Sequence, residues 1–124
     1  MKIDTFIKRF KNKAITDDIT VTSKDFKSFA TCFKNYLKRT FPDAKVENFS
    51  AGHYDVSSFI VFPSGTIVYV HYDVPRGERP IDVNRRDASG GVLYRTAKST
   101  KDYSGGSNNF TSLLDMKEIR RLDR

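Results

Sequence analysis

The sequence predicts an α+β fold, in which N-terminal helices and a C-terminal helix pack on a small antiparallel β-sheet of three or four strands. Apolar residues recur with helical spacing in the first third, two runs rich in β-branched and aromatic residues follow, and leucine and isoleucine return near the C-terminus. A chain of 124 residues has the size of one domain. We divide this single domain into a basic helical part (1–41), a sheet with long loops (42–110) and a closing helix (111–124).

Two amphipathic helices are expected in the first third of the chain. Residues 3–10 form a short helix by their apolar spacing, and a longer helix begins near Ser23, whose hydroxyl is a suitable N-cap. Pro42 ends the second helix, because the residue before a proline is disfavoured in helical geometry. Cys32 lies in this helix among phenylalanines and is expected in the core rather than as a nucleophile. The apolar stripe consists of Phe26, Phe29, Ala30, Phe33 and Leu37.

A β-hairpin is predicted in the middle of the chain, after a possible short strand at Val46–Phe49. Its strands are Tyr54–Phe62 and Thr66–Val74, and their apolar residues alternate. They are joined by a three-residue loop that ends in Gly65, placed in the left-handed conformation. This loop pairs Tyr54 with Val74 and Val56 with Tyr72, so that the numbers of paired residues share one sum, and a shift by one residue would separate the two apolar faces. The register therefore follows from the sequence.

The remaining elements are predicted from turn residues and short apolar runs. Pro75–Gly91 is a long polar connection, and Val92–Thr96 is one more strand. Lys98–Asn109 is rich in glycine, serine and asparagine and is expected to be a flexible segment. The closing helix is indicated by Leu113, Leu114, Ile119 and Leu122.

The tetrapeptide His-Tyr-Asp-Val occurs twice, at positions 53–56 and 71–74, and the two copies contain both histidines of the chain. In the predicted register the copies lie side by side at one end of the hairpin. Asp55 is then opposite Asp73 on the face away from the apolar side chains, and His71 lies beside them. The sequence thus predicts a polar patch of imidazole and carboxylate groups.

Two opposed carboxylates repel each other, so a positive group is expected beside them. Zinc or manganese held by His53, Asp55, His71 and Asp73 would supply it, since those metals accept this ligand mixture. A protonated histidine or an arginine of Pro75–Arg86 would also serve. The ion-pair interpretation requires fewer coincidences, because the arginine-rich loop follows directly in sequence. We therefore expect no cofactor, with the metal site as the alternative.

The formal net charge is +7, and most of the excess lies near the N-terminus. Residues 1–41 contain ten Lys/Arg against four Asp/Glu, whereas residues 42–74 contain one against four. Such polarity suits an acidic protein surface or nucleic acid, although a solvated basic surface requires no partner. The candidate residues for contacts to a partner or to nucleic acid are Lys27, Lys34, Lys38, Arg39, Arg76, Arg79, Arg85, Arg86, Arg95, Lys98, Lys101 and Tyr103.

Several classes of protein find no support in the sequence. It contains no P-loop, dinucleotide-binding, nucleophile-elbow or CxxC motif. No apolar run is long enough to cross a membrane, and the charged N-terminus differs from a secretory signal. With one cysteine, no internal disulfide can form, which fits a reducing compartment. We therefore expect a cytoplasmic protein without membrane contact.

A resemblance is carried by Gly52-His53-Tyr54, by the strand end Tyr72-Asp73-Val74 and by the segment Tyr94–Asn109. Together these resemble small uncharacterised proteins carried by phages and plasmids of low-GC Gram-positive bacteria, over roughly residues 46–110. That group supplies no established catalytic residues. The resemblance implies a setting among accessory genes of mobile elements, which often encode compact inhibitors of host defence, including anti-CRISPR proteins.

Three functions remain, in order of preference. The first is a non-enzymatic inhibitor that binds a host protein or ribonucleoprotein through an acidic or nucleic-acid surface. The second is a protein that binds DNA or RNA phosphates directly through lysine and arginine. The third is a small metal-dependent hydrolase centred on His53, Asp55, His71 and Asp73.

Overall fold

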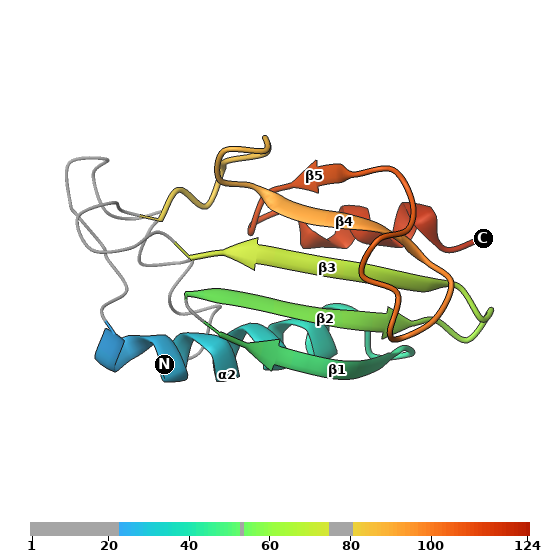
Figure 1. Cartoon of the computed structure of the whole chain (residues 1–124), viewed down its shortest axis with the longest axis horizontal. Helices are drawn as coiled ribbons and strands as arrows, with labels where there is room; N and C mark the ends of the chain where they lie inside the picture. Colours follow the sequence, from blue (N-terminus) through green and yellow to red (C-terminus); the bar gives the residue numbers. More distant parts are fainter. Residues whose placement is uncertain (1–22, 53, 75–80) are drawn as a thin grey trace.

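The computed structural model describes residues 23–52, 54–74 and 81–124, and the helix predicted for residues 3–10 lies outside them. Figure 1 shows a sheet with one long helix beside it. The elements are α2 (Ser23–Thr40), β1 (Lys45–Ala51), β2 (Asp55–Val61), β3 (Ile67–Asp73), β4 (Val92–Ala97), β5 (Asn109–Thr111) and the 3₁₀ helix η1 (Met116–Leu122).

The sheet is an antiparallel meander of five strands in the order β1-β2-β3-β4-β5. The α+β class is therefore confirmed, but the sheet has five strands instead of the expected three or four. The additional strand is β5, which has only three residues and pairs with β4 through Phe110 and Leu93. Three residues are too short to show a period of two, so the sequence pattern could not separate β5 from the preceding loop.

The predicted register of the central hairpin is confirmed. Val56 pairs with Tyr72 and Asp55 pairs with Asp73, as the three-residue loop requires. Gly65 has φ of +94°, and its N–H donates to the carbonyl of Phe62 over 2.9 Å. Loop chemistry and alternating hydrophobicity agree here, and together they determine which side chains share a face.

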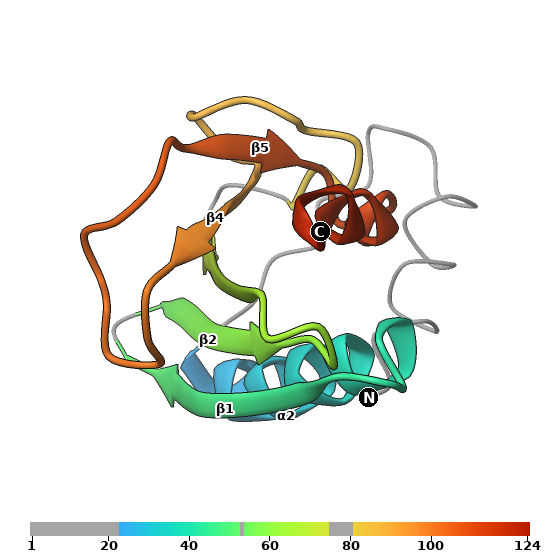
Figure 2. The ribbon, with the colours of Figure 1, turned by 90° about the vertical axis from the view of Figure 1, so that its right-hand side faces the viewer.

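The main core lies between α2, one face of the sheet and η1. Phe33 of α2 is fully buried, and its ring stacks on that of Tyr72 with centroids 6.1 Å apart. Cys32 is buried in the same cluster, as predicted. Both helices lie on one side of the curved sheet (Figure 2). The buried stripe of α2 is therefore the reason that this helix packs where it does.

The closing helix is a 3₁₀ helix rather than an α-helix. Its Met116 and Ile119 are fully buried, and their spacing of three residues suits a helix with three residues per turn. Arg120 holds this end of the chain to the turn before β1, with its Nη2 atom 2.6 Å from Oδ1 of Asp43. The hydrogen bond from Arg120 lowers the pKa of the Asp43 carboxyl from its usual value.

The opposite face of the sheet carries a second, smaller apolar cluster. Phe59 is fully buried there and Tyr69 is 8% exposed, because the segment between β4 and β5 folds back over them. The Tyr103 ring packs edge-on against both, with centroid distances of 5.3 and 5.7 Å. Asn48 of β1 also donates to the carbonyl of Thr100 over 2.7 Å. The segment expected to be flexible is thus held against the sheet.

Gly106 permits this segment to approach β4, and its replacement by alanine is expected to destabilise the fold. Its φ is +71°, and an added Cβ would lie 2.6 Å from the carbonyl oxygen of Thr96. Left-handed strain and the clash together should lower the free energy of unfolding by about 3 kcal/mol. Gly65→Ala is the control, because its φ is also positive but nothing lies within 4 Å of its Cβ. That change should cost only roughly 1–2 kcal/mol. Equal losses in urea unfolding would show that the approach to Thr96 is unimportant.

Candidate binding groove and a carboxylate–histidine cluster

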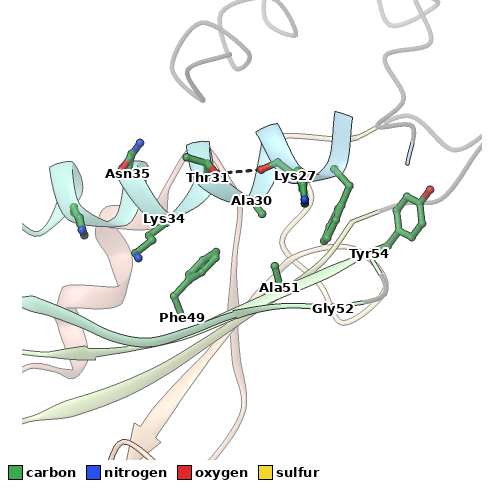
Figure 3. Close-up of a pocket in the computed structure, with 11 residues that line it drawn as sticks. Lys27, Ala30, Thr31, Lys34, Asn35, Phe49, Ala51, Gly52 and Tyr54 are labelled. Carbon is green, nitrogen blue, oxygen red and sulfur yellow. Dashed lines mark hydrogen bonds between the residues drawn. The ribbon is translucent and has the colours of Figure 1, made fainter. Parts of the chain in front are cut away.

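A groove of about 800 Å³ lies between α2 and β1 (Figure 3). Its rim carries three lysines of α2, and its walls include three aromatic side chains. The small residues Ala30, Thr31 and Ala51 leave the space between them open. The lysines are Lys27, Lys34 and Lys38, and the aromatic residues are Phe26, Phe49 and Tyr54. We call this site the α2–β1 groove.

The lysines share the groove because of their spacing along α2. Positions 27, 34 and 38 are seven and four residues apart, which returns each of them to the same side of an α-helix. This side borders the apolar stripe, so the lysine stems extend along the wall while the amines reach solvent. The sequence contained this spacing, but only the position of β1 turns a basic helix face into a groove.

A bulge in β1 places the aromatic wall opposite the lysines. The register of β1 on β2 shifts between Glu47 and Ser50, and Asn48 has φ of +51°. Asn48 points to the segment on the outer face, whereas Phe49 packs against the core on the α2 side. The amine of Lys34 lies 5.7 Å from the centroid of the Phe49 ring. Figure 3 shows the Lys34 side chain extending from α2 toward the Phe49 ring. The extra residue of a bulge redirects the side chains that follow it.

The groove lysines form no ion pair with a carboxylate of the described residues. Within the described ranges, no carboxylate forms an ion pair with Lys27, Lys34 or Lys38. Lys27 and Lys38 are exposed, and Lys34 is half-buried. Three amines along one groove therefore produce a positive potential that attracts anions. Arg39 is also exposed on α2, but it does not line the groove.

The arginines of the loop before β4 have other partners. Arg85 is 3.0 Å from Oδ1 of Asp87 and also donates to Ser89. Arg86 bridges Asp115 and Glu118, at 2.9 and 2.6 Å. Arg76 and Arg79 lie outside the described residues. The two described arginines thus hold their own loop and the start of η1, and neither pairs with the twin His-Tyr-Asp segments.

The remaining residues that were predicted to contact a partner or nucleic acid lie on the outer face of the sheet. Arg95 lies over the Tyr69 ring at 4.6 Å, and it donates to the carbonyl of Tyr103 and to Asn108. Tyr103 is 55% exposed, although one side of it seals the outer apolar cluster. Lys98 and Lys101 are exposed near the tip of the same segment. Arg95 is therefore a packing residue, and these lysines lie apart from the α2–β1 groove.

The structure brings three of the four predicted metal ligands together. One ligand atom each from Asp55, His71 and Asp73 lies within 4.8 Å of the others. Nε2 of His71 is 2.9 Å from Oδ1 of Asp73, and the Tyr69 hydroxyl is 3.3 Å from Nδ1. Burial raises the pKa of the Tyr69 phenol, so the hydroxyl stays neutral beside the imidazole. His53 lies outside the described residues.

Sequence reasoning missed the aromatic wall of the groove. Phe26 was expected in the core stripe and Tyr54 on the apolar face of the hairpin, yet both are half-buried and their rings meet at 5.3 Å beside the groove. Phe49 was expected only as the end of a short strand. No local signal reveals the bulge that turns this ring toward α2, because Asn48 is an ordinary residue for a turn or strand end.

Comparisons with protein-family models, curated proteins and solved structures gave no match to this chain. Among the described residues, no helix has the length and apolar character that crossing a membrane requires. The function is therefore argued from the geometry of the groove and the cluster.

Proposed function

We propose that the chain is a non-enzymatic binding protein that engages a nucleic-acid-handling complex of a host cell through the α2–β1 groove and inhibits it. One observation carries the proposal: Lys27, Lys34 and Lys38 converge on a groove with apolar walls, and no described carboxylate neutralises them. Arg85, Arg86 and Arg120 each form an ion pair with a carboxylate, whereas the groove lysines form none within the described residues. A basic site of this kind is suited to an anionic partner.

The walls of the groove favour an acidic protein segment over stacked bases. Phe26 already packs against Tyr54, and Lys34 lies over Phe49, so each of these rings has a neighbour on one side. A partner that offers apolar side chains to the walls and carboxylates to the lysines fits this arrangement. The resemblance to proteins of mobile elements supports an inhibitor, because such genes often act on host defence complexes.

Direct binding to DNA or RNA is the second candidate, and the same unpaired lysines support it. The rise of a helix spreads positions 27 to 38 over about 16 Å, which is long enough to contact several phosphates. Three lysine–phosphate contacts predict that the logarithm of affinity falls with the logarithm of salt concentration with a slope of about 3. A protein partner with an apolar contact would show a shallower dependence.

These two candidates are separated by recovering the tagged chain from host cytoplasm with and without nuclease treatment. We expect a nucleic-acid-handling complex to remain bound after nuclease, and the purified complex to bind the chain and lose activity. If only nucleic acid is recovered, and gel shifts at low salt reproduce that binding, the direct mode replaces the inhibitor. If neither DNA nor RNA shifts and no complex binds the purified chain, both proposals fail.

A further inference from the structure

Two negatively charged side chains lie close together at the end of the β2–β3 hairpin, outside the groove. Asp55 and Asp73 are cross-strand neighbours, so two carboxylates face each other on the outer face of the sheet. Directly opposed like charges destabilise a strand pair. His71 is the only described side chain that forms an ion-pair contact with either of them, with Nε2 2.9 Å from Oδ1 of Asp73.

The lysines and arginines of the described part do not compensate this pair. Arg85 and Arg86 have carboxylate partners elsewhere, and Arg76 and Arg79 of the loop that the sequence predicted would neutralise the aspartates lie outside the described residues. Arg95 is the cation of the adjacent strand on the same face, but it lies over Tyr69 and donates to Asn108. Within the described ranges, no lysine or arginine forms an ion pair with Asp55 or Asp73.

We propose that Asp55, His71 and Asp73 bind one divalent transition-metal ion, with zinc or manganese as the chemical class. One imidazole nitrogen and two carboxylate oxygens are a ligand set that these metals accept, whereas calcium requires oxygen ligands alone. The ligand atoms already lie within 4.8 Å of one another. Asp73 is exposed at the end of β3, so its side chain can turn to complete the approach.

Tyr69 supports this assignment from outside the ligand set. Its hydroxyl is 3.3 Å from Nδ1 of His71, and its ring is held by Phe59, Tyr103 and Arg95. Metal-binding histidines commonly use their second nitrogen in a hydrogen bond that fixes the orientation of the ring. With Nδ1 beside the phenol oxygen, Nε2 is the nitrogen that contacts Asp73, 2.9 Å from its Oδ1. The imidazole is thus aimed at the proposed ion by a packed residue.

The proposal is tested by calorimetric titration of the chelator-treated, tag-free chain with zinc and separately with manganese. We expect one ion to bind per chain and to raise the melting temperature by about 10 °C at a hundredfold excess over Kd. The ring nitrogen resonances of His71 should shift in the same titration. No binding and no change in melting temperature at millimolar metal would overturn the proposal.

Asp55→Asn with Asp73→Asn is the informative variant, because it removes both charges while keeping an oxygen acceptor at each position. We expect at least a hundredfold loss of metal affinity and, without metal, a melting temperature equal to or above that of the unchanged chain. Asp87→Asn is the control, since it removes an exposed carboxylate outside the cluster. Undiminished metal binding by the double variant would place the ion elsewhere and refute this site.

Discussion

Replacing Lys27, Lys34 and Lys38 together by glutamate is expected to abolish binding of the partner while leaving the fold intact. In the proposed complex each lysine forms an ion pair at an exposed or half-exposed position, and such pairs contribute up to about 1 kcal/mol each. Losing three of them corresponds to roughly a hundredfold weaker affinity, and the repulsion introduced by glutamate adds to that. Affinity should be measured by calorimetry with the purified complex, and folding by circular dichroism.

The matched control reverses the same number of charges outside the groove. Lys98, Lys101 and Lys117 are exposed and do not line the groove, so their joint replacement by glutamate changes the net charge equally. We expect this control to slow association while changing affinity less than tenfold. An equal loss in both triple variants would mean that overall charge, and not the groove, determines binding. Unchanged affinity in the groove variant would contradict the proposed function in both of its forms.

Phe33→Ala is expected to cause the largest loss of stability from a single substitution considered for this chain. The Phe33 side chain is fully buried, and its ring packs between those of Phe29 and Tyr72 at 6.2 and 6.1 Å. Removing a buried phenylalanine ring leaves a cavity and typically costs about 3–5 kcal/mol. Since small domains are stable by about 5–15 kcal/mol, the variant should be close to unfolding. Urea unfolding followed by circular dichroism measures the difference.

Phe49→Ala is the comparison for Phe33→Ala. Phe49 is half-buried at the wall of the groove and packs on the edge of the core. We expect its loss to cost less than half as much stability, because a ring at the surface leaves no enclosed cavity. Partner affinity should nevertheless fall, since the apolar wall is removed. If Phe33→Ala were as mild as Phe49→Ala, the main core would not depend on α2.

The parts of the fold that sequence predicted well are those in which local signals agree. The stripe of α2 repeats with helical spacing over about three turns, and it is buried from Phe29 to Leu37. The hairpin register follows from a three-residue loop with Gly65 at its end, and Asp55 lies opposite Asp73 as expected. Each of these features depends on residues close together in the chain, where spacing alone selects the geometry.

The outer face of the sheet was not predicted, because its cover comes from a distant segment. Phe59 and Tyr69 interrupt the expected polar side of the hairpin, and they are buried only because Tyr103 returns from the β4–β5 connection. A glycine- and serine-rich sequence indicates turns but does not show which surface the turns contact. The bulge in β1 was not predicted for a related reason, because a bulge is defined by how β1 pairs with β2.

By itself, the sequence determined α2, the central hairpin with its register and the adjacency of Asp55, His71 and Asp73, since these follow from spacing along the chain. Only the tertiary structure decided which charged side chains form ion pairs. Arg86 reaches Asp115, and Arg120 reaches Asp43, across 29 and 77 positions of sequence. Pairing over such separations depends on how the helices meet the sheet. Among the described residues, it leaves the groove lysines without a carboxylate partner and the two aspartates without a lysine or arginine partner. These two sites are therefore where the partner and the metal ion are proposed to bind.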